Sequence, residues 1–243
     1  MVMVLNFAHR GFKANYPENT LYAFSKAIKS ADGIEFDVHL SKDGIPVIIH
    51  DETLERTTDG SGFVKDLPLA ELKQFNAAIN SRDFEHLNEK IPTLEEYFNL
   101  VKHEDIISNI ELKTNIFEYP GIENAVYELI TKYGLEKNCI VSSFNHKTLK
   151  RFKDAAPEVA CGVLTSDVLF APADYVKALG CEYFHPSVFF PPQDIVALHE
   201  QNIRVNVWHS AVPASYFPQY KAGVDALIKA GVDGVITDFE DLF

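Results

Sequence analysis

The stretch LNFAHRGFKANYPENTLYAF, residues 5–24, contains the pattern from which the fold can be worked out. Its first residues belong to an apolar run at 3–8, whose length and composition predict a buried strand. Between 21 and 28 the apolar side chains recur every three or four residues, which is the spacing of an amphipathic helix. Asn19 or Thr20 stands where a helix-capping side chain is expected. The stretch therefore predicts a strand followed directly by a helix.

The same alternation of short apolar runs and longer amphipathic segments continues along the chain. Further strands are predicted at 33–38, 46–49, 106–112, 139–142, 159–164, 182–185, 203–207 and 234–237. Further helices are predicted at 93–102, 122–133, 146–155, 172–179, 192–201 and 221–230. About eight such units in one domain length favour an α/β fold closed as a (β/α)8 TIM barrel. No glycine-rich dinucleotide motif follows any strand, which disfavours a doubly wound sheet, so we expect a single barrel domain over 1–243.

Residues 51–91 interrupt this alternation. They are polar and rich in turn-forming residues, and they are too long for an ordinary connection between a barrel strand and its helix. DGSG at 59–62 predicts a turn between two short extended pieces, and LPLAELKQF at 67–75 predicts a short helix. We therefore expect a small inserted subdomain after the second barrel strand.

The composition argues against several classes of protein. The formal net charge is −13, so the surface repels nucleic acids and anionic membranes. No apolar run reaches the ~18 residues of a transmembrane helix, and stable membrane insertion is not expected. Cys139, Cys161 and Cys181 have neither disulfide nor zinc spacing and are expected as reduced core residues. Because the N-terminus shows no signal-peptide pattern, we expect a cytoplasmic protein.

Acidic residues collect at the predicted carboxyl ends of neighbouring strands. Glu35 and Asp37 are two residues apart on one strand and therefore share a face, while Glu111 lies near the end of the next barrel strand. Three carboxylates at one barrel mouth repel one another unless a cation lies between them. Oxygen ligands without cysteine suit Mg²⁺ or Ca²⁺. The alternative is a salt-bridge network in which Arg10 and Lys113 neutralise the acids.

Histidines and cations accompany these acids. His9 and Arg10 follow the first strand, His50 follows the hairpin after the second, and Lys113 follows Glu111. The ordinary pKa of histidine, near ~6.5, suits an acid–base pair that works near neutrality. A guanidinium group matches the geometry of phosphate oxygens. We therefore predict a mouth that faces a phosphoryl group and a metal ion.

Four stretches together resemble the glycerophosphodiester phosphodiesterase family. They are AHRGFKANYPENTLYAF at 8–24, GIEFDVHLSKDGIPVIIHDETLERTTDGSG at 33–62, IPTLEE at 91–96 and IELK at 110–113. The resemblance implies a TIM barrel with a small inserted segment and one divalent cation, Ca²⁺ or Mg²⁺. It also implies hydrolysis of small glycerophosphodiesters to sn-glycerol 3-phosphate and an alcohol such as choline or ethanolamine.

The resemblance also assigns roles to individual residues. It makes His9 and His50 the general acid–base pair. The metal ligands that it implies are Glu35, Asp37 and Glu111. It implies that Arg10 and Lys113 contact the phosphate. It also implies that Glu18 and Asn19 form part of the pocket wall, although Asn19 is equally suited to cap a helix.

Some features leave the choice of alcohol open. Where the family commonly reads VWTVN, this chain reads VWHSA at 207–211, so that His209 and Ser210 replace the usual polar pair. Aromatic residues near the mouth, Trp208 above all, could pack against a choline-like head group; the others are Phe144, Phe189, Phe190 and Phe217. His185 ends a predicted strand and is either a substrate-binding rim residue or a structural one.

Two other functions remain open from the sequence. One is a lysophospholipase D or sphingomyelinase D-like phosphodiesterase that acts on lipids, and the aromatic segments SVFFPP and SYFPQY are compatible with it. The other is a non-catalytic phosphate-binding barrel. The sequence also leaves open which histidine is the acid, whether water or a neighbouring hydroxyl attacks, and whether the chain forms a homodimer.

Overall fold

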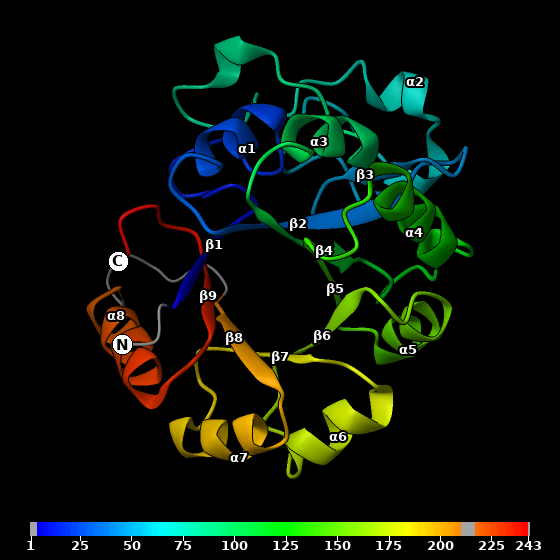
Figure 1. Cartoon of the computed structure of the whole chain (residues 1–243). Coiled ribbons are helices and arrows are strands. Elements are labelled where there is room, and N and C mark those ends of the chain that lie inside the picture. Colours follow the sequence, from blue (N-terminus) through cyan, green and yellow to red (C-terminus); the bar gives the residue numbers. More distant parts are fainter. Residues whose placement is uncertain (1–3, 210–216, 243) are drawn as a thin grey trace.

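The strands of this protein form a closed barrel. The structure is a computed structural model that describes residues 4–209 and 217–242. Within these residues eight parallel strands pair side by side, and the ring closes because β1 is hydrogen-bonded to both β9 and β2 (Figure 1). The eight are β1 (Leu5–His9), β2 (Gly33–Leu40), β4 (Ile107–Leu112), β5 (Cys139–Ser143), β6 (Ala160–Thr165), β7 (Tyr183–Pro186), β8 (Arg204–Trp208) and β9 (Gly234–Thr237). The predicted TIM barrel is confirmed.

Helices cover the outside of the ring, as Figure 1 shows. They are α1 (Leu21–Ala27), α3 (Leu94–Val101), α4 (Ile122–Tyr133), α5 (His146–Ala155), α6 (Pro172–Leu179), α7 (Ile195–Glu200) and α8 (Phe217–Ala230). The predicted helix at 192–201 begins as a 3₁₀ turn, η3 (Pro192–Asp194), after which α7 continues. No helix within 4–209 and 217–242 is both long and apolar enough to cross a membrane.

Capping side chains fix the beginnings of two helices beside the site. Of the two predicted caps for α1, it is the Thr20 side chain that accepts a hydrogen bond from the backbone N–H of Ala23. Thr93 and Glu96 form a complete capping box at the start of α3, as the sequence pattern predicts. Helix α4 ends at Gly134, whose φ of 66° is a left-handed conformation that glycine adopts without steric cost.

The apolar core of the barrel has two compartments. The larger lies between the strands and the outer helices, where the three cysteines are buried as predicted. The smaller lies inside the barrel, where Phe7, Ile140, Tyr183 and Ile236 pack together. This inner cluster fills the barrel interior, so that side chains from the strand ends line an open mouth rather than a continuous pore.

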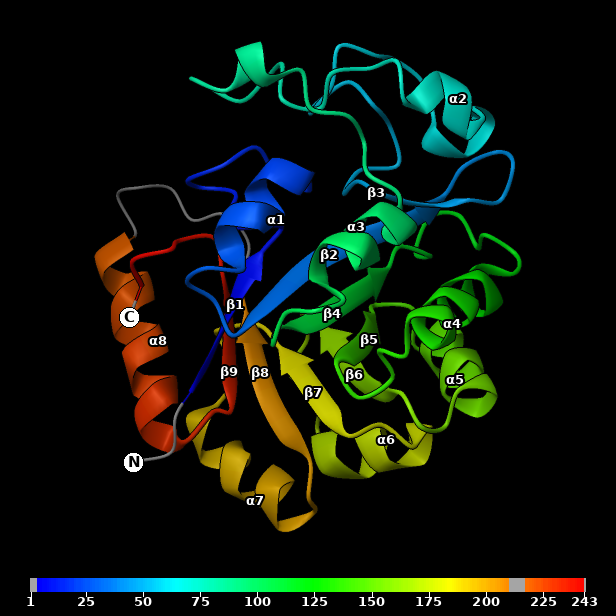
Figure 2. The same ribbon diagram turned by 45° about the horizontal axis from the view of Figure 1, so that its top comes forward.

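The segment 51–91 packs on a small apolar cluster of its own. It follows β3 (Pro46–Ile48), which pairs antiparallel with β2, and it contains η1 (Val64–Asp66), α2 (Leu69–Leu72) and η2 (Glu85–Leu87). Figure 2 shows it beyond β3, α1 and α3, on one side of the barrel. The cluster combines Leu54, Val64, Leu72, Ala77 and Ile91 of the segment with Val47 and Ile49 of the preceding hairpin. The segment therefore has apolar packing beyond that of the barrel core.

Candidate active site

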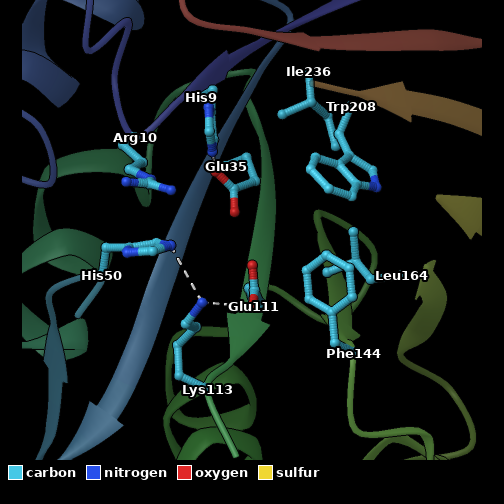
Figure 3. Close-up of a pocket in the computed structure, with 10 residues that line it drawn as sticks. All are labelled: His9, Arg10, Glu35, His50, Glu111, Lys113, Phe144, Leu164, Trp208 and Ile236. Atoms are coloured by element: carbon cyan, nitrogen blue, oxygen red, sulfur yellow. Dashed lines mark hydrogen bonds and ion pairs between the residues drawn. The ribbon is translucent and has the colours of Figure 1, made fainter. Parts of the chain in front are cut away.

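The carboxyl ends of the barrel strands surround a cavity of about 270 Å³. Its lining, drawn in Figure 3, consists of His9, Arg10, Glu35, His50, Glu111, Lys113, Phe144, Leu164, Trp208 and Ile236. Most of the residues singled out in the sequence are thus brought to one place. They meet because the parallel strands all end at the same face of the barrel.

The three predicted acidic residues form one buried cluster. Asp37 of β2 pairs in register with Glu111 of β4, and Glu35 lies two residues before Asp37 on the same face. One carboxylate oxygen from each residue lies within 4.8 Å of the other two. All three side chains are buried, with Asp37 completely inaccessible. The predicted convergence of Glu35, Asp37 and Glu111 is observed.

The negative charge of this cluster is only partly compensated. Within the described residues, Glu35 Oε2 and Asp37 Oδ1 accept no hydrogen bond, and Glu111 Oε1 has only its contact with Lys113. Burial, together with the neighbouring charges of Asp37 and Glu111, holds the pKa of Glu35 well above its ordinary value. Burial also raises the pKa of Glu111, although Lys113 opposes that shift. A divalent cation bound by oxygen atoms would supply the missing partner, so the residues fit a metal site.

Asp37 shows that the salt-bridge alternative also holds in part. Its Oδ2 accepts a hydrogen bond of 2.9 Å from Asn19 and lies 3.3 Å from Nε of Arg10. Burial would raise the pKa of Asp37, but Arg10, His50 and Lys113 together lower it. Asp37 is therefore an ionised carboxylate, with Arg10 and Asn19 at its Oδ2 and Lys113 3.8 Å from its Oδ1.

His9, the last residue of β1, is held from behind by an acid on the last strand. Its Nδ1 lies 2.5 Å from Oδ1 of Asp238, and its Nε2 lies 3.6 Å from Oε2 of Glu35. Burial and the charge of Arg10 lower the pKa of His9 to about 4, against the opposing effect of Asp238. Because a carboxylate can only accept, Nδ1 carries the proton and Nε2 faces the acidic cluster.

His50 has the same arrangement on the other flank. Its Nδ1 lies 2.5 Å from Oδ1 of Asp51, and its Nε2 lies 3.3 Å from Nζ of Lys113. The hydrogen bond from His50 lowers the pKa of Asp51, with Arg56 acting in the same direction. Both histidines thus line one cavity, and each has a carboxylate behind it that orients its ring.

Two cations stand beside the acids. Lys113 Nζ lies 3.1 Å from Oε1 of Glu111, and although burial opposes its charge, Glu111 and Asp37 raise the pKa of Lys113. Arg10 has φ of 50° and donates from Nη1 to Oε1 of Glu18 at 3.0 Å. Glu18 and Asn19 do not line the cavity; they contact Arg10 and Asp37, which lie around it.

The opposite side of the cavity is apolar. Phe144 and Trp208 meet edge to face with ring centroids 5.3 Å apart, and Leu164 and Ile236 complete this side.

The other aromatic residues predicted near the mouth do not line the cavity. Phe190 is buried against Phe184, and Phe189 is exposed. The side chain of Phe217 and the whole of Ser210 lie outside the described residues. His209 is buried, with Nε2 3.8 Å from Asp238.

His185 is not brought to the cavity. It is completely buried inside the barrel, where burial lowers its pKa to about 3. Its Nε2 lies 3.3 Å from the side-chain nitrogen of Asn206, and its ring occupies the space above Gly162 that any Cβ there would fill. The strand-end position of His185 in the sequence did not reveal that its side chain points inward below the mouth.

Three residues in the surroundings of the site received no role from the sequence. Asp238 and Asp51 support the two histidines, and Arg56 joins Asp51 to Glu18. Asp238 ends the last strand and Asp51 follows His50 directly, so position alone could have marked both. Arg56 lies inside the inserted segment, and nothing in its sequence context indicates that it reaches the site.

Comparison with known proteins places the chain in a family. The sequence model of the glycerophosphoryl diester phosphodiesterase family matches residues 9–242. A glycerophosphodiester phosphodiesterase of Caldanaerobacter subterraneus subsp. tengcongensis is 41% identical over 236 residues, which cover 96% of this chain and 93% of the relative. A glycerophosphodiester phosphodiesterase of Bacillus altitudinis is 41% identical over 242 residues, covering 97% and 94%.

A solved structure shares the fold at lower identity. It is an Oleispira antarctica phosphodiesterase in complex with the product sn-glycerol-3-phosphate, with a TM-score of 0.84 and 31% sequence identity. The match covers 97% of this chain and 93% of that one. The likeness thus extends over nearly the whole chain.

Proposed function

Since this chain belongs to the glycerophosphoryl diester phosphodiesterase family, we propose that it hydrolyses small glycerophosphodiesters to sn-glycerol 3-phosphate and an alcohol with the help of one divalent cation. Glu35, Asp37 and Glu111 hold the cation. His9 and His50 transfer the protons. The observation that carries the proposal is a buried, incompletely paired acidic cluster beside one cavity, which Glu35 and Glu111 line together with two imidazoles, each supported by a carboxylate.

The charges of the site suit a phosphodiester. When bound, the divalent cation neutralises negative charge on the phosphoryl oxygens as they approach the transition state. Arg10 and Lys113 lie at the cavity beside the same acids and bind the remaining phosphoryl oxygens. Without these cations, an anionic substrate would meet a strongly acidic protein.

The two histidines divide two proton transfers. One imidazole accepts the proton of the attacking nucleophile, either water or the neighbouring glycerol hydroxyl, and the other protonates the leaving alkoxide. If the glycerol hydroxyl attacks, water then opens the cyclic phosphate to give sn-glycerol 3-phosphate. Each ring is held with its Nδ1–H on a carboxylate, so both transfers take place at Nε2: the base accepts there as a neutral ring and the acid donates there as an imidazolium. The apolar side with Trp208 and Phe144 packs against the carbon atoms of the substrate or against a cationic alcohol.

The peripheral residues hold the site in shape. Asn19 fixes one oxygen of Asp37, and Glu18 fixes the guanidinium of Arg10. We also propose that 51–91 is a subdomain of its own, supported by its separate apolar cluster. That the protein is cytoplasmic and that it forms a homodimer are predictions from the sequence alone.

One observation favours lyso-lipids as an alternative substrate class. Phe170 and Phe189 are exposed on the loops after β6 and β7, which lie at the same end of the barrel as the cavity. Exposed aromatic residues beside an active site can contact the acyl chain of a lipid. A substrate comparison therefore belongs in the first experiment.

The test measures release of sn-glycerol 3-phosphate from glycerophosphocholine and of choline from lysophosphatidylcholine, before and after treatment with EDTA, with Mg²⁺ or Ca²⁺ added back. The proposal expects turnover that EDTA abolishes and one of the ions restores. Turnover that ignores chelation would remove the metal from the mechanism. Turnover of lysophosphatidylcholine alone would favour the lipid enzyme, and metal binding without turnover of either substrate would favour a binding protein.

A further inference from the structure

Arg56, inside the inserted segment, is hydrogen-bonded to two acidic residues, Glu18 of the barrel and Asp51 at the start of the segment. Its Nη1 and Nη2 donate to the two carboxylate oxygens of Glu18 at 2.7 and 2.8 Å. Its Nε and Nη2 donate to the two carboxylate oxygens of Asp51 at 2.6 and 3.1 Å. One guanidinium therefore makes two bidentate contacts, one with the loop after β1 and one with the residue that follows His50.

Each of these carboxylates also holds a residue of the cavity. Asp51 Oδ1 accepts from Nδ1 of His50, and Glu18 Oε1 accepts from Nη1 of Arg10. Arg56 does not itself line the cavity. It stands at the centre of a chain of alternating charges that runs from Arg10 through Glu18, Arg56 and Asp51 to His50.

The geometry distinguishes this network from an ordinary surface ion pair. Exposed pairs contribute little because each side chain is free to move, and the Arg56 side chain is 45% exposed. Here, however, the planar guanidinium is fixed by four hydrogen bonds, and the Glu18 side chain is only 14% exposed. Without Arg56, both carboxylates lose a bidentate partner and are free to turn away from His50 and Arg10.

We infer that Arg56 is a positioning residue that orients the His50 imidazole and the Arg10 guanidinium together. The inserted segment is thereby coupled to the proton-transferring residue and to the phosphate-binding residue at once. The expected effect of Arg56 on turnover rests on the proposed function, whereas its expected effect on the orientation of the His50 ring does not. Lysine could not replace arginine fully, because an ammonium group lacks the planar fork that spans two carboxylates.

The kinetic test compares Arg56→Gln with Arg82→Gln. Arg82 is an exposed arginine of the same segment with no ion pair among the described residues, so the control makes the same chemical change and the same change in net charge. With glycerophosphocholine as substrate, we expect Arg56→Gln to lower kcat by roughly 10- to 100-fold, the range for a misplaced catalytic group. KM should change less than kcat. Arg56→Lys should recover part of the loss, and Arg82→Gln should match the wild type.

A double-mutant cycle shows whether Arg56 acts through Asp51. Asp51→Asn alone should lower kcat, and adding Arg56→Gln should lower it by less than the product of the two single effects. Fully multiplicative losses, a kcat of Arg56→Gln within twofold of the wild type, or an equal loss in Arg82→Gln would overturn the inference.

A second measurement does not depend on turnover. Nitrogen-15 NMR of the imidazoles, with His50→Gln used to assign the signal, reports which ring nitrogen of His50 carries the proton. The wild type should show one tautomer protonated at Nδ1, and Arg56→Gln should show a mixture. An unchanged His50 signal in a folded Arg56→Gln variant would contradict the inference. If the wild type does not hydrolyse glycerophosphocholine, the proposed function fails and this measurement still decides the role of Arg56.

Discussion

The two sides of the cavity differ in almost every respect. One side, formed by the ends of β1, β2 and β4 and by the residue after the β3 hairpin, carries the two histidines, the acids and the cations. The other side, formed by the ends of β5, β6, β8 and β9, carries Phe144, Leu164, Trp208 and Ile236. Figure 3 shows the polar and apolar side chains facing each other across the cavity. We call them the polar side and the apolar side.

The difference between the two sides suggests that they have separate tasks in the reaction. The polar side concentrates buried charge that needs a cation, whereas the side chains of the apolar side carry no charge. Changes on the polar side should therefore affect turnover strongly. Changes on the apolar side should affect the choice of alcohol, with smaller effects on rate.

The largest effects are expected from the two histidines. His9→Ala and His50→Ala should each lower kcat by roughly 10²- to 10⁴-fold, because each removes one proton transfer. The measurement is steady-state hydrolysis of glycerophosphocholine, with circular dichroism to show that each variant is folded. A near wild-type rate in either variant would remove that histidine from the mechanism. It would also show that the two histidines do not have equivalent roles.

Binding of a cation at the metal site should raise the thermal stability of the protein. A cation at about 100 times its Kd adds ~2.7 kcal/mol to the free energy of unfolding. That gain corresponds to a rise in Tm of about 5–10 °C for a domain of this size. We expect Mg²⁺ or Ca²⁺ to produce this rise in the wild type, measured by differential scanning calorimetry.

Glu35→Gln is the matched variant for this measurement. It removes a buried charge that Asp37 and Glu111 repel, so without metal it should be at least as stable as the wild type. With metal, its Tm should rise much less. An equal rise in both proteins would place the cation elsewhere than on the polar side.

The apolar side is tested by substrate preference. Trp208→Leu should lower kcat/KM for glycerophosphocholine about 5-fold, in line with the ~1 kcal/mol of a partly exposed cation–π contact. For glycerophosphoglycerol, whose alcohol has no charge, the change should be smaller. The matched control is Leu164→Met on the same side. Equal losses with both substrates would exclude recognition of a cationic alcohol by Trp208.

The smallest effect on activity is expected from a substitution that lies on neither the polar nor the apolar side of the cavity. Thr93→Ala removes the capping box of α3 and should cost ~1 kcal/mol of stability, seen as a fall in Tm of about 2–4 °C. The kcat of the folded protein should not change. A large loss of kcat would show that α3 influences the site and that the cavity cannot be treated as two independent sides.

The fold was predictable because strand and helix periods are local properties of the sequence. The strands lie within two residues of the predicted ranges, and the capping box at Thr93 begins α3. Glu35 and Asp37 could be placed on one face by strand geometry alone, and the barrel then brings Glu111 beside them.

The rest depends on contacts that sequence spacing does not contain. Asn19 has a left-handed φ of 57° and donates to Asp37, while the adjacent Thr20 caps α1. Only the closed ring brings Asp238 of the last strand end to His9 of the first. His185 points inward beneath the mouth, where its ring lies over Gly162 of the neighbouring strand, a close approach that no local pattern reveals.

The central claim is that Glu35, Asp37 and Glu111 share one divalent cation within reach of both histidines. The most direct test is a crystal structure grown with Mn²⁺ and sn-glycerol 3-phosphate, with an anomalous difference map recorded at the manganese edge. We predict one strong peak bounded by these three carboxylates and a phosphate oxygen of the product. A map with no peak there, and with Arg10 and Lys113 alone on the carboxylates, would contradict the account.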